Sequence, residues 1–300
     1  FAPRFSPDGS KVIMSLAKSG VTDIYILCFQ QTIENGPVMI GPRTRKTVES
    51  SYLLCMLGFI YLPVIILVLF SFQSGNLPVP PLNGPSLRWY YKVFENERLV
   101  EALVNSLLVS GISGIAATAL GFLSAYSLSR HQIRFVGLAR FLLIAPVTVS
   151  YLIIGMGLLI TFNVVGINKS LWAVCLGHTI MNLPLSFAII FSQMSDSHKS
   201  IDAAAHDLGA SDFQTITRVV IPMMKAPLFA SFFLAATLSW DEFIIAFLLS
   251  QFETTLPVII FELLRAGLTP EVNAVGTLVF LTSIILVVAV AATMIFGKEK

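Results

Sequence analysis

The sequence predicts an all-α membrane protein with six transmembrane helices, and three observations lead to this fold class. Hydrophobic residues make up 55% of the 300 residues and charged residues only 12%, with a mean hydropathy of +0.81, whereas a soluble domain carries about 25% charged residues. Six segments are long and apolar enough to cross a bilayer. Lys and Arg are unevenly divided between the segments that connect them. The net charge of +2 gives no reason to expect a nucleic-acid partner.

The N-terminal residues do not share this apolar pattern. The segment Phe1–Leu27 places a Pro-Asp-Gly turn between two alternating apolar runs, which is typical of a β-hairpin. It resembles one strand–turn–strand unit of a TolB-type β-propeller repeat, in which FSPDG followed by DIYI is common. One such unit cannot bury its own apolar face. We therefore expect residues 1–46 to be a fragment or fused extension that contributes little to function, and residues 47–300 to form the membrane domain.

The six candidate spans follow one another along the rest of the chain. They are Ser51–Phe72, Ala102–Tyr126, Leu138–Phe162, Leu171–Ser192, Ala226–Ser250 and Ala274–Phe296. Pro146 and Pro184 lie inside two of them and should kink their helices, freeing a backbone carbonyl. A kink that serves a pathway and a kink with only a packing role remain equally open.

The distribution of basic residues predicts the orientation of the spans. With the N-terminus inside, eleven Lys and Arg lie in the inner segments and five in the outer ones. The inner ones are Arg43, Arg45, Lys46, Arg130, Arg134, Arg140, Lys199, Arg218, Lys225, Lys298 and Lys300, and the outer ones are Arg88, Lys92, Arg98, Lys169 and Arg265. The positive-inside rule therefore predicts that both termini lie in the cytoplasm.

The sequence offers no constellation for catalysis or metal binding. It contains no GxxxxGK[ST], HExxH or GxSxG motif. The three cysteines and four histidines show no metal-ligand spacing, and we interpret them as structural or interfacial residues. These residues are Cys28, Cys55, Cys175, His131, His178, His198 and His206. We expect no metal, no cofactor and no catalytic residue on this chain.

A polar segment interrupts the apolar pattern between the fourth and fifth spans. It reads DAAAHDLGASDFQTITRVVIP over Asp202–Pro222 and predicts a short helix, a turn at Gly209 and a second helix capped by Ser211–Asp212. Its apolar residues share one edge. Composition alone leaves open an amphipathic helix that lies on the lipid headgroups.

The spacing within this segment resembles the EAA loop of bacterial ABC importer permeases, in which EAA is followed by three residues, Gly, nine residues and I-x-L-P. Ala204 and Ala205 occupy the two alanine positions, and Gly209 occupies the glycine position. Ala210 follows the glycine, and Pro222 occupies the proline position. The motif's glutamate position is Ala203, with Asp202 just before it, so either Asp202 substitutes for it or coupling is weaker. The resemblance implies that residues 200–224 form a coupling loop that docks in a groove of a separate ATPase, which would hold ATP and Mg.

The chain from about residue 50 to 297 is similar to the spermidine/putrescine (PotC/PotI-like) group of these permeases. The stretches that carry this resemblance most clearly are LSWDEFIIAFLLS over Leu238–Ser250 and TTLPVIIFELLRAGLTPEVNA over Thr254–Ala274. The resemblance implies a MetI-like six-helix fold in the bacterial inner membrane and polyamine transport. It also implies three kinds of partner: a second permease subunit, two ATPase subunits and a periplasmic substrate-binding protein.

An acidic pair lies inside the fifth candidate span. An ionised carboxylate in the membrane costs several kcal/mol unless it meets water or a partner, and a cationic substrate would provide that partner. We therefore expect Asp241 or Glu242 to line the substrate pathway, together with Trp240. The alternative is that one carboxylate pairs with a Lys, an Arg or an amide and orders the helices.

The loop after the fifth span is expected to face the periplasm. Glu262, Arg265 and Glu271 are candidates for a gate or for contacts with the delivery protein. An importer of another solute, such as ferric iron, thiamine or a small anion, remains an alternative within the family. A secondary transporter or channel is a further alternative, although no inverted repeat is visible. A membrane enzyme lacks residues to act with.

Overall fold

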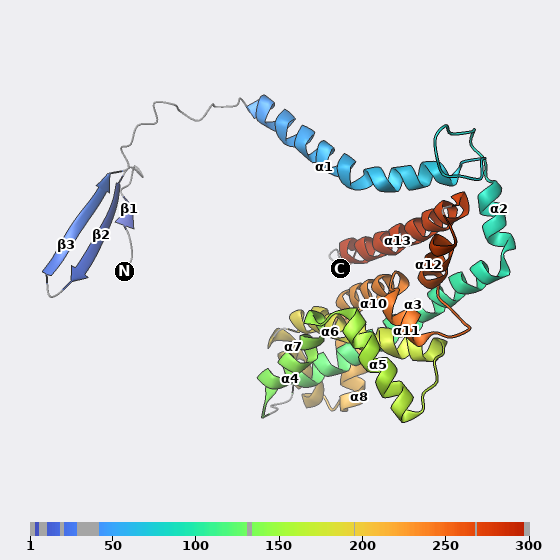
Figure 1. The fold of residues 1–300 in the computed structure, drawn as a ribbon. Coiled ribbons are helices and arrows are strands. Elements are labelled where there is room, and N and C mark those ends of the chain that lie inside the picture. The colour runs from blue at the N-terminus through green and yellow to red at the C-terminus, as the bar shows by residue number, and fades with distance from the viewer. Residues whose placement is uncertain are drawn as a thin grey trace. The chain divides into compact units, whose positions relative to one another are not determined.

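Figure 1 shows the computed structural model, which describes residues 4–5, 11–18, 21–28, 42–130, 134–194, 196–267 and 269–296. The chain divides into two compact units, Phe1–Pro63 and Val64–Lys300. The boundary that the sequence suggests, at residue 46, stays a prediction.

The first unit contains three strands and the start of a long helix. The strands β1 (Arg4–Phe5), β2 (Lys11–Lys18) and β3 (Val21–Cys28) form one antiparallel sheet in the order β1-β2-β3. β1 and β2 flank the predicted Pro-Asp-Gly turn, but residues 6–10 lie outside the described residues. Helix α1 (Pro42–Ser71) begins in this unit and runs through Pro63.

The regular elements described in the second unit are helices, and an isolated antiparallel bridge joins Gln73 to Pro85. After α1 come α2 (Arg88–Glu95), α3 (Glu97–Arg130), α4 (Val136–Ile144), the 3₁₀ turn η1 (Ala145–Thr148), α5 (Tyr151–Val165), α6 (Leu171–Ser192), α7 (Asp196–Asp207), α8 (Asp212–Thr215), the π-helical turn η2 (Ile216–Val220), α9 (Ile221–Met223), α10 (Lys225–Trp240), α11 (Ile244–Leu249), α12 (Leu256–Ala266) and α13 (Pro270–Phe296).

The structure confirms a mostly helical membrane fold and changes the picture of two spans. Among the described residues, four helices, α1, α3, α6 and α13, are long and apolar enough to cross a membrane, and the number is up to six if each of two bent pairs is one span. The first pair joins α4–η1 to α5 at an angle of 107°, and the second joins α8–α9 to α10 at 76°. The predicted fifth span, Ala226–Ser250, stops at Trp240 and resumes at Ile244.

Close contact between α3 and two other helices forms the centre of the second unit. A Cβ atom on Gly121 of α3 would lie 2.9 Å from the backbone nitrogen of Phe187 in α6, and one on Gly114 would lie 3.3 Å from Cβ of Ala236 in α10. Glycines at these positions let the helices approach backbone to backbone, which is how helices associate where lipid supplies little hydrophobic drive.

Polar side chains occupy the same centre. Ser113 of α3 donates a hydrogen bond to Ser239 of α10 at 2.9 Å, and Asn182 of α6 donates to the carbonyl of Ala235 at 3.2 Å. Thr118 and Ser231 lie 3.3 Å apart across the α3–α10 contact. These buried hydrogen bonds fix the register of three neighbouring helices, since each side chain would otherwise be an unsatisfied polar group.

Candidate functional site

The predicted turn at Gly209 forms a sharp corner after α7. Gly209 has φ of +86°, a conformation that costs other residues about 1–2 kcal/mol. Its N–H donates to the carbonyl of His206 at 2.8 Å, and the N–H of Ala210 donates to the carbonyl of Ala205 at 3.0 Å. The bond from Ala210 is the six-to-one bond of a Schellman motif, which terminates helices at a glycine. The local sequence thus ends α7 and reverses the chain within three residues.

The second helix of the corner begins with the cap that the sequence predicts. The hydroxyl of Ser211 accepts a hydrogen bond from the N–H of Gln214, and the Gln214 side chain accepts one from the N–H of Ser211. This reciprocal arrangement is a capping box. The following π-helical turn, η2, ends with the N–H of Ile221 donating to the carbonyl of Ile216. Pro222, which has no N–H to donate, comes directly after this widened turn.

The corner presents apolar side chains away from the packed helices. The side chains of Leu208 and Phe213 are 90% and 75% exposed. Ala204 is exposed on the preceding turn, and Ala205 and Ala210 are half-buried beneath them. We call Leu208, Phe213 and Ala204 the apolar rim. A rim of this kind fits a helix-in-groove contact with another protein.

Asp202 is buried, in contrast to the exposed apolar rim. Its side chain forms an ion pair with Arg130, the last residue of α3. Sequence reasoning left open whether Asp202 replaces the docking glutamate of the motif. In the structure its carboxylate faces the protein's own helices. Nothing in the spacing of the motif indicates this direction, because Arg130 is 72 residues away.

The fifth span breaks at the acidic pair. Asp241 follows the last residue of α10 and is exposed, whereas Glu242 is buried. The Glu242 carboxylate accepts hydrogen bonds from the N–H groups of Ile244, Ile245 and Ala246, at 2.9, 2.9 and 3.2 Å. Glu242 therefore caps α11 and satisfies donors that have no partner inside the helix.

Buried polar groups surround the capping carboxylate. His178 of α6 is fully buried, with Nε2 3.3 Å from Oε2 of Glu242 and Nδ1 2.6 Å from the hydroxyl of Ser239. Ser239 in turn accepts from Ser113, so α3, α6, α10 and the start of α11 share one network. From the sequence, His178 was interpreted as a structural or interfacial residue and was not connected to Glu242 or Ser239. The sequence signal that could have indicated this network is the presence of polar side chains within three apolar spans.

Trp240 is buried beside the break, Phe243 is half-buried and Phe247 is exposed. Trp240 is 2% exposed and belongs to a cluster with Leu99 and Ala274. The ring of Phe243 lies 4.8 Å from that of Phe261 on α12 and 5.4 Å from that of Phe247. Among the three predicted pathway residues, Asp241 is thus the one whose side chain reaches the surface of this chain.

The predicted outer-loop residues occupy separate positions around α12. Glu262 forms an ion pair with Arg98 at 2.7 Å, which joins α12 to the start of α3. Arg265 is exposed, with its guanidinium carbon 5.7 Å from the centre of the Phe261 ring. Glu271 lies in the first turn of α13 and is half-buried. The structure does not bring these three side chains together.

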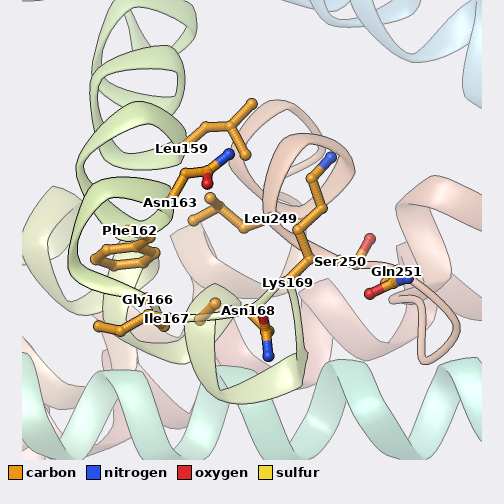
Figure 2. A pocket seen from close by; sticks show the side chains of 11 residues that line it. Leu159, Phe162, Asn163, Gly166, Ile167, Asn168, Lys169, Leu249, Ser250 and Gln251 are labelled. Atoms are coloured by element: carbon orange, nitrogen blue, oxygen red, sulfur yellow. The ribbon is translucent and has the colours of Figure 1, made fainter.

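A cavity of about 430 Å³ lies where the α5–α6 and α11–α12 connections meet. Figure 2 shows Asn163, Lys169 and Gln251 at this cavity, with the apolar side chains of Phe162 and Leu249. The N–H of Ser170 donates to the carbonyl of Leu249 at 3.0 Å and holds the two connections together. Sequence reasoning did not identify this cavity, because its residues are separated by about 80 positions of chain.

Known proteins are similar to this chain in sequence and in fold. Residues 117–298 match the family described as binding-protein-dependent transport system inner membrane component. The match begins after the strands and gives no support to the TolB-type resemblance of residues 1–27. The spermidine/putrescine transport system permease protein PotC of Haemophilus influenzae is 29% identical over 246 residues, which cover 82% of this chain and 95% of the relative.

Two further relatives and two solved structures agree. PotC of Escherichia coli K12 is 26% identical over 263 residues (87% of this chain, 97% of the relative), and its putrescine transport system permease protein PotI is 31% identical over 247 residues (79% and 87%). A bacterial ABC transporter involved in the import of alginate is similar in fold, with a TM-score of 0.61, 19% identity and coverage of 83% and 95%. A bacterial alginate ABC transporter, in complex with an alginate pentasaccharide-bound periplasmic protein, is also similar in fold. Its TM-score is 0.62 at 15% identity, and the match covers 86% of this chain and 96% of that chain.

Proposed function

The chain belongs to the family of binding-protein-dependent transport system inner membrane components, and we propose that it is one of two permease subunits of an ATP-driven polyamine importer. Members of this family are permeases in the inner membrane rather than enzymes, and ATP is hydrolysed on a separate ATPase subunit. The proposed assembly adds a second permease, two ATPase subunits that hold ATP and Mg, and a periplasmic binding protein. The proposed substrates are spermidine and putrescine.

The observation that carries this proposal is the corner between α7 and α8. Gly209 and the Ser211 capping box fix two short helices around one turn, with Leu208 and Phe213 exposed at its tip. Burying one such side chain contributes about 1.5–3 kcal/mol, so the apolar rim alone supplies a substantial contact. A groove on an ATPase subunit is the proposed partner, and its movement on binding ATP would be transmitted to the permease helices.

Two observations support a polyamine as the substrate. The relatives PotC and PotI carry spermidine or putrescine in their names. Asp241 is exposed at a break within the fifth span, where a carboxylate requires water or a cation. We assign the substrate pathway to Asp241 and a supporting role to Glu242 and Trp240, which are buried behind it. Glu262, Arg265 and Glu271 are proposed contacts for the binding protein or parts of an outer gate.

Uptake of radiolabelled spermidine and putrescine tests the proposal. Proteoliposomes would contain this chain with its co-encoded permease and ATPase, and would receive the binding protein outside and ATP inside. We expect ATP-dependent uptake that is lost in Gly209→Val, because valine at φ of +86° costs about 1–2 kcal/mol and reshapes the corner. Gly209→Asn is the matched control, since asparagine tolerates this conformation and a Cβ atom meets nothing within 4 Å.

Each outcome has a different meaning. Normal ATP-driven uptake in Gly209→Val would contradict the role of the corner. If the loaded binding protein stimulates ATP hydrolysis but no polyamine is taken up, the chain is still an importer subunit, but the substrate is not a polyamine. Uptake driven by an ion gradient, without any ATPase, would show a secondary transporter instead.

A further inference from the structure

One buried ion pair joins the cytoplasmic corner to a membrane-spanning helix. Nε of Arg130, at the end of α3, donates to Oδ2 of Asp202 in α7. The two side chains are only 9% and 8% exposed. The guanidinium carbon of Arg130 also lies 5.6 Å from the centre of the Tyr126 ring, one turn earlier on α3. Arg130 is thus held in position by its own helix and reaches across to α7.

Stability alone does not account for this pair. Burying two charges is costly, and apolar side chains of similar size often stabilise a protein as well or better. Arg130 Nη1 and Nη2 and Asp202 Oδ1 are buried and have no hydrogen-bond partner within the described part of the chain. What the pair does supply is a directional link between two defined points, which an apolar contact lacks.

The pair is also distinctive in what it connects. Among the hydrogen bonds of the described residues, Arg130 to Asp202 is the one that joins α7 to a spanning helix. Helix α7 also packs against α8 and η2, which belong to the same loop. The far side of the loop is attached differently, through Val220 and Met224, which are buried in a cluster with Phe122 of α3. The loop therefore meets α3 at two places, one polar and one apolar.

We propose that Arg130 and Asp202 are positioning residues that make α7 and the cytoplasmic end of α3 move as one body. The inference rests on the proposed function, in which an ATPase pulls on the corner. When the apolar rim follows the ATPase, the ion pair transmits the displacement of α7 to α3, and the Val220 cluster transmits that of η2. Asp202 is then a link within the permease, and docking on the ATPase falls to the apolar rim.

The test compares transport with ATP hydrolysis in the complete importer. Asp202→Asn and Arg130→Gln should each still co-purify with the ATPase and hydrolyse ATP, while polyamine uptake per ATP hydrolysed falls about tenfold. Asp202→Glu, which retains the charge, should restore most of the uptake. The double variant Arg130→Asp/Asp202→Arg should transport better than either reversed single variant. Glu101→Gln, which removes an exposed carboxylate from the opposite end of α3, is the control and should leave the ratio unchanged.

Several results would overturn the inference. One is an unchanged ratio of uptake to ATP hydrolysis in both Asp202→Asn and Arg130→Gln. Another is loss of the ATPase from Asp202→Asn while Arg130→Gln keeps it, because Asp202 would then be a docking residue. If the single variants fail to accumulate, the reversed pair decides. Transport by the reversed pair supports the link, and a reversed pair that neither accumulates nor transports refutes it. Gly209→Val separates the two proposals. If it blocks uptake while Asp202→Asn does not, only the link fails; if it transports normally, the proposed function fails.

Discussion

Asp241 and Glu242 are neighbours in the sequence but lie in different environments. Glu242 accepts three backbone hydrogen bonds from α11 and is packed beside the fully buried His178. Asp241, one residue earlier, is exposed after the last turn of α10. The break in the helix produces this difference, because residues 241–243 leave the helical conformation and the Glu242 carboxylate accepts the free N–H groups at the start of α11. Glu242 is therefore the residue that stabilises the break, and Asp241 is the one placed to meet a cation.

This division predicts that two isosteric substitutions affect different properties, one the stability of the chain and the other the KM for uptake. Glu242→Gln should destabilise the chain by about 2 kcal/mol, because three N–H groups lose a charged acceptor. Asp241→Asn should leave the thermal midpoint unchanged and should raise the KM for spermidine uptake by weakening attraction of the cation. Thermal unfolding in detergent and initial uptake rates, measured on the same preparations, check both effects. Equal loss of stability in the two variants would assign Asp241 a structural role.

At the scale of elements, two helices are broken where a membrane helix is expected to be continuous. In the third span, the 3₁₀ turn η1 contains Pro146, and Ser150 adopts an extended conformation before α5 begins. In the fifth span, Glu242 supplies the acceptors that α11 requires. Non-helical backbone at membrane depth is tolerated where its polar groups are satisfied within the protein. Both breaks thus divide their spans into shorter helices.

Hydropathy located the spans but not these breaks. Pro146, where a kink was predicted, lies in the turn η1 that breaks the third span, whereas α6 continues through Pro184. The sequence placed the fourth span at Leu171–Ser192, which are also the bounds of α6, and predicted the turn at Gly209 and the cap at Ser211 from local chemistry. A hydropathy window sums composition over about 20 residues, so a break of three residues with satisfied polar groups hardly changes it. The direction of Asp202 was equally out of reach, since it depends on a contact with Arg130 that only the folded chain creates.

The contact between α3 and α6 gives a prediction for one helix with its own control. Gly121→Val should destabilise the chain by about 1–3 kcal/mol, because a Cβ atom there lies 2.9 Å from Phe187 backbone and Ser186 side-chain atoms. Gly111→Val, on the same helix, should have a much smaller effect, since a Cβ atom at Gly111 meets nothing within 4 Å. Retention of monodisperse protein after heating in detergent measures the difference. Equal loss in both variants would indicate that helix propensity, rather than the α3–α6 contact, is responsible.

At the scale of the whole membrane domain, contacts between connections agree with the predicted orientation. The α5–α6 connection is bonded to the end of α11 through Ser170 and Leu249, and Arg98 at the start of α3 pairs with Glu262 of α12. All of these lie in segments expected to face the periplasm. Arg130 and Asp202 join two segments expected to face the cytoplasm. No described hydrogen bond between connections has to cross the membrane in this arrangement.

The bent α4–α5 pair provides the sharpest test of that orientation. If α4, η1 and α5 together cross the membrane despite the angle of 107°, residues after α5 face the periplasm and those after α6 face the cytoplasm. If the pair enters and leaves on the same side, both connections exchange sides. Cysteines introduced as Lys169→Cys and Asp207→Cys, in a background lacking Cys28, Cys55 and Cys175, distinguish the two topologies. The chain is expressed without its ATPase so that Asp207 stays accessible.

We expect a membrane-impermeant maleimide to label Lys169→Cys in intact spheroplasts and Asp207→Cys only after permeabilisation. Lys169 follows the third span, and eleven basic residues against five place the loop containing Asp207 inside. The cysteine-free background gives the baseline for labelling. The reverse pattern would mean that the α4–α5 pair is re-entrant. The apolar rim at Leu208 would then face the periplasm, where no ATPase can reach it, and both the coupling role of Gly209 and the link through Asp202 would have to be abandoned.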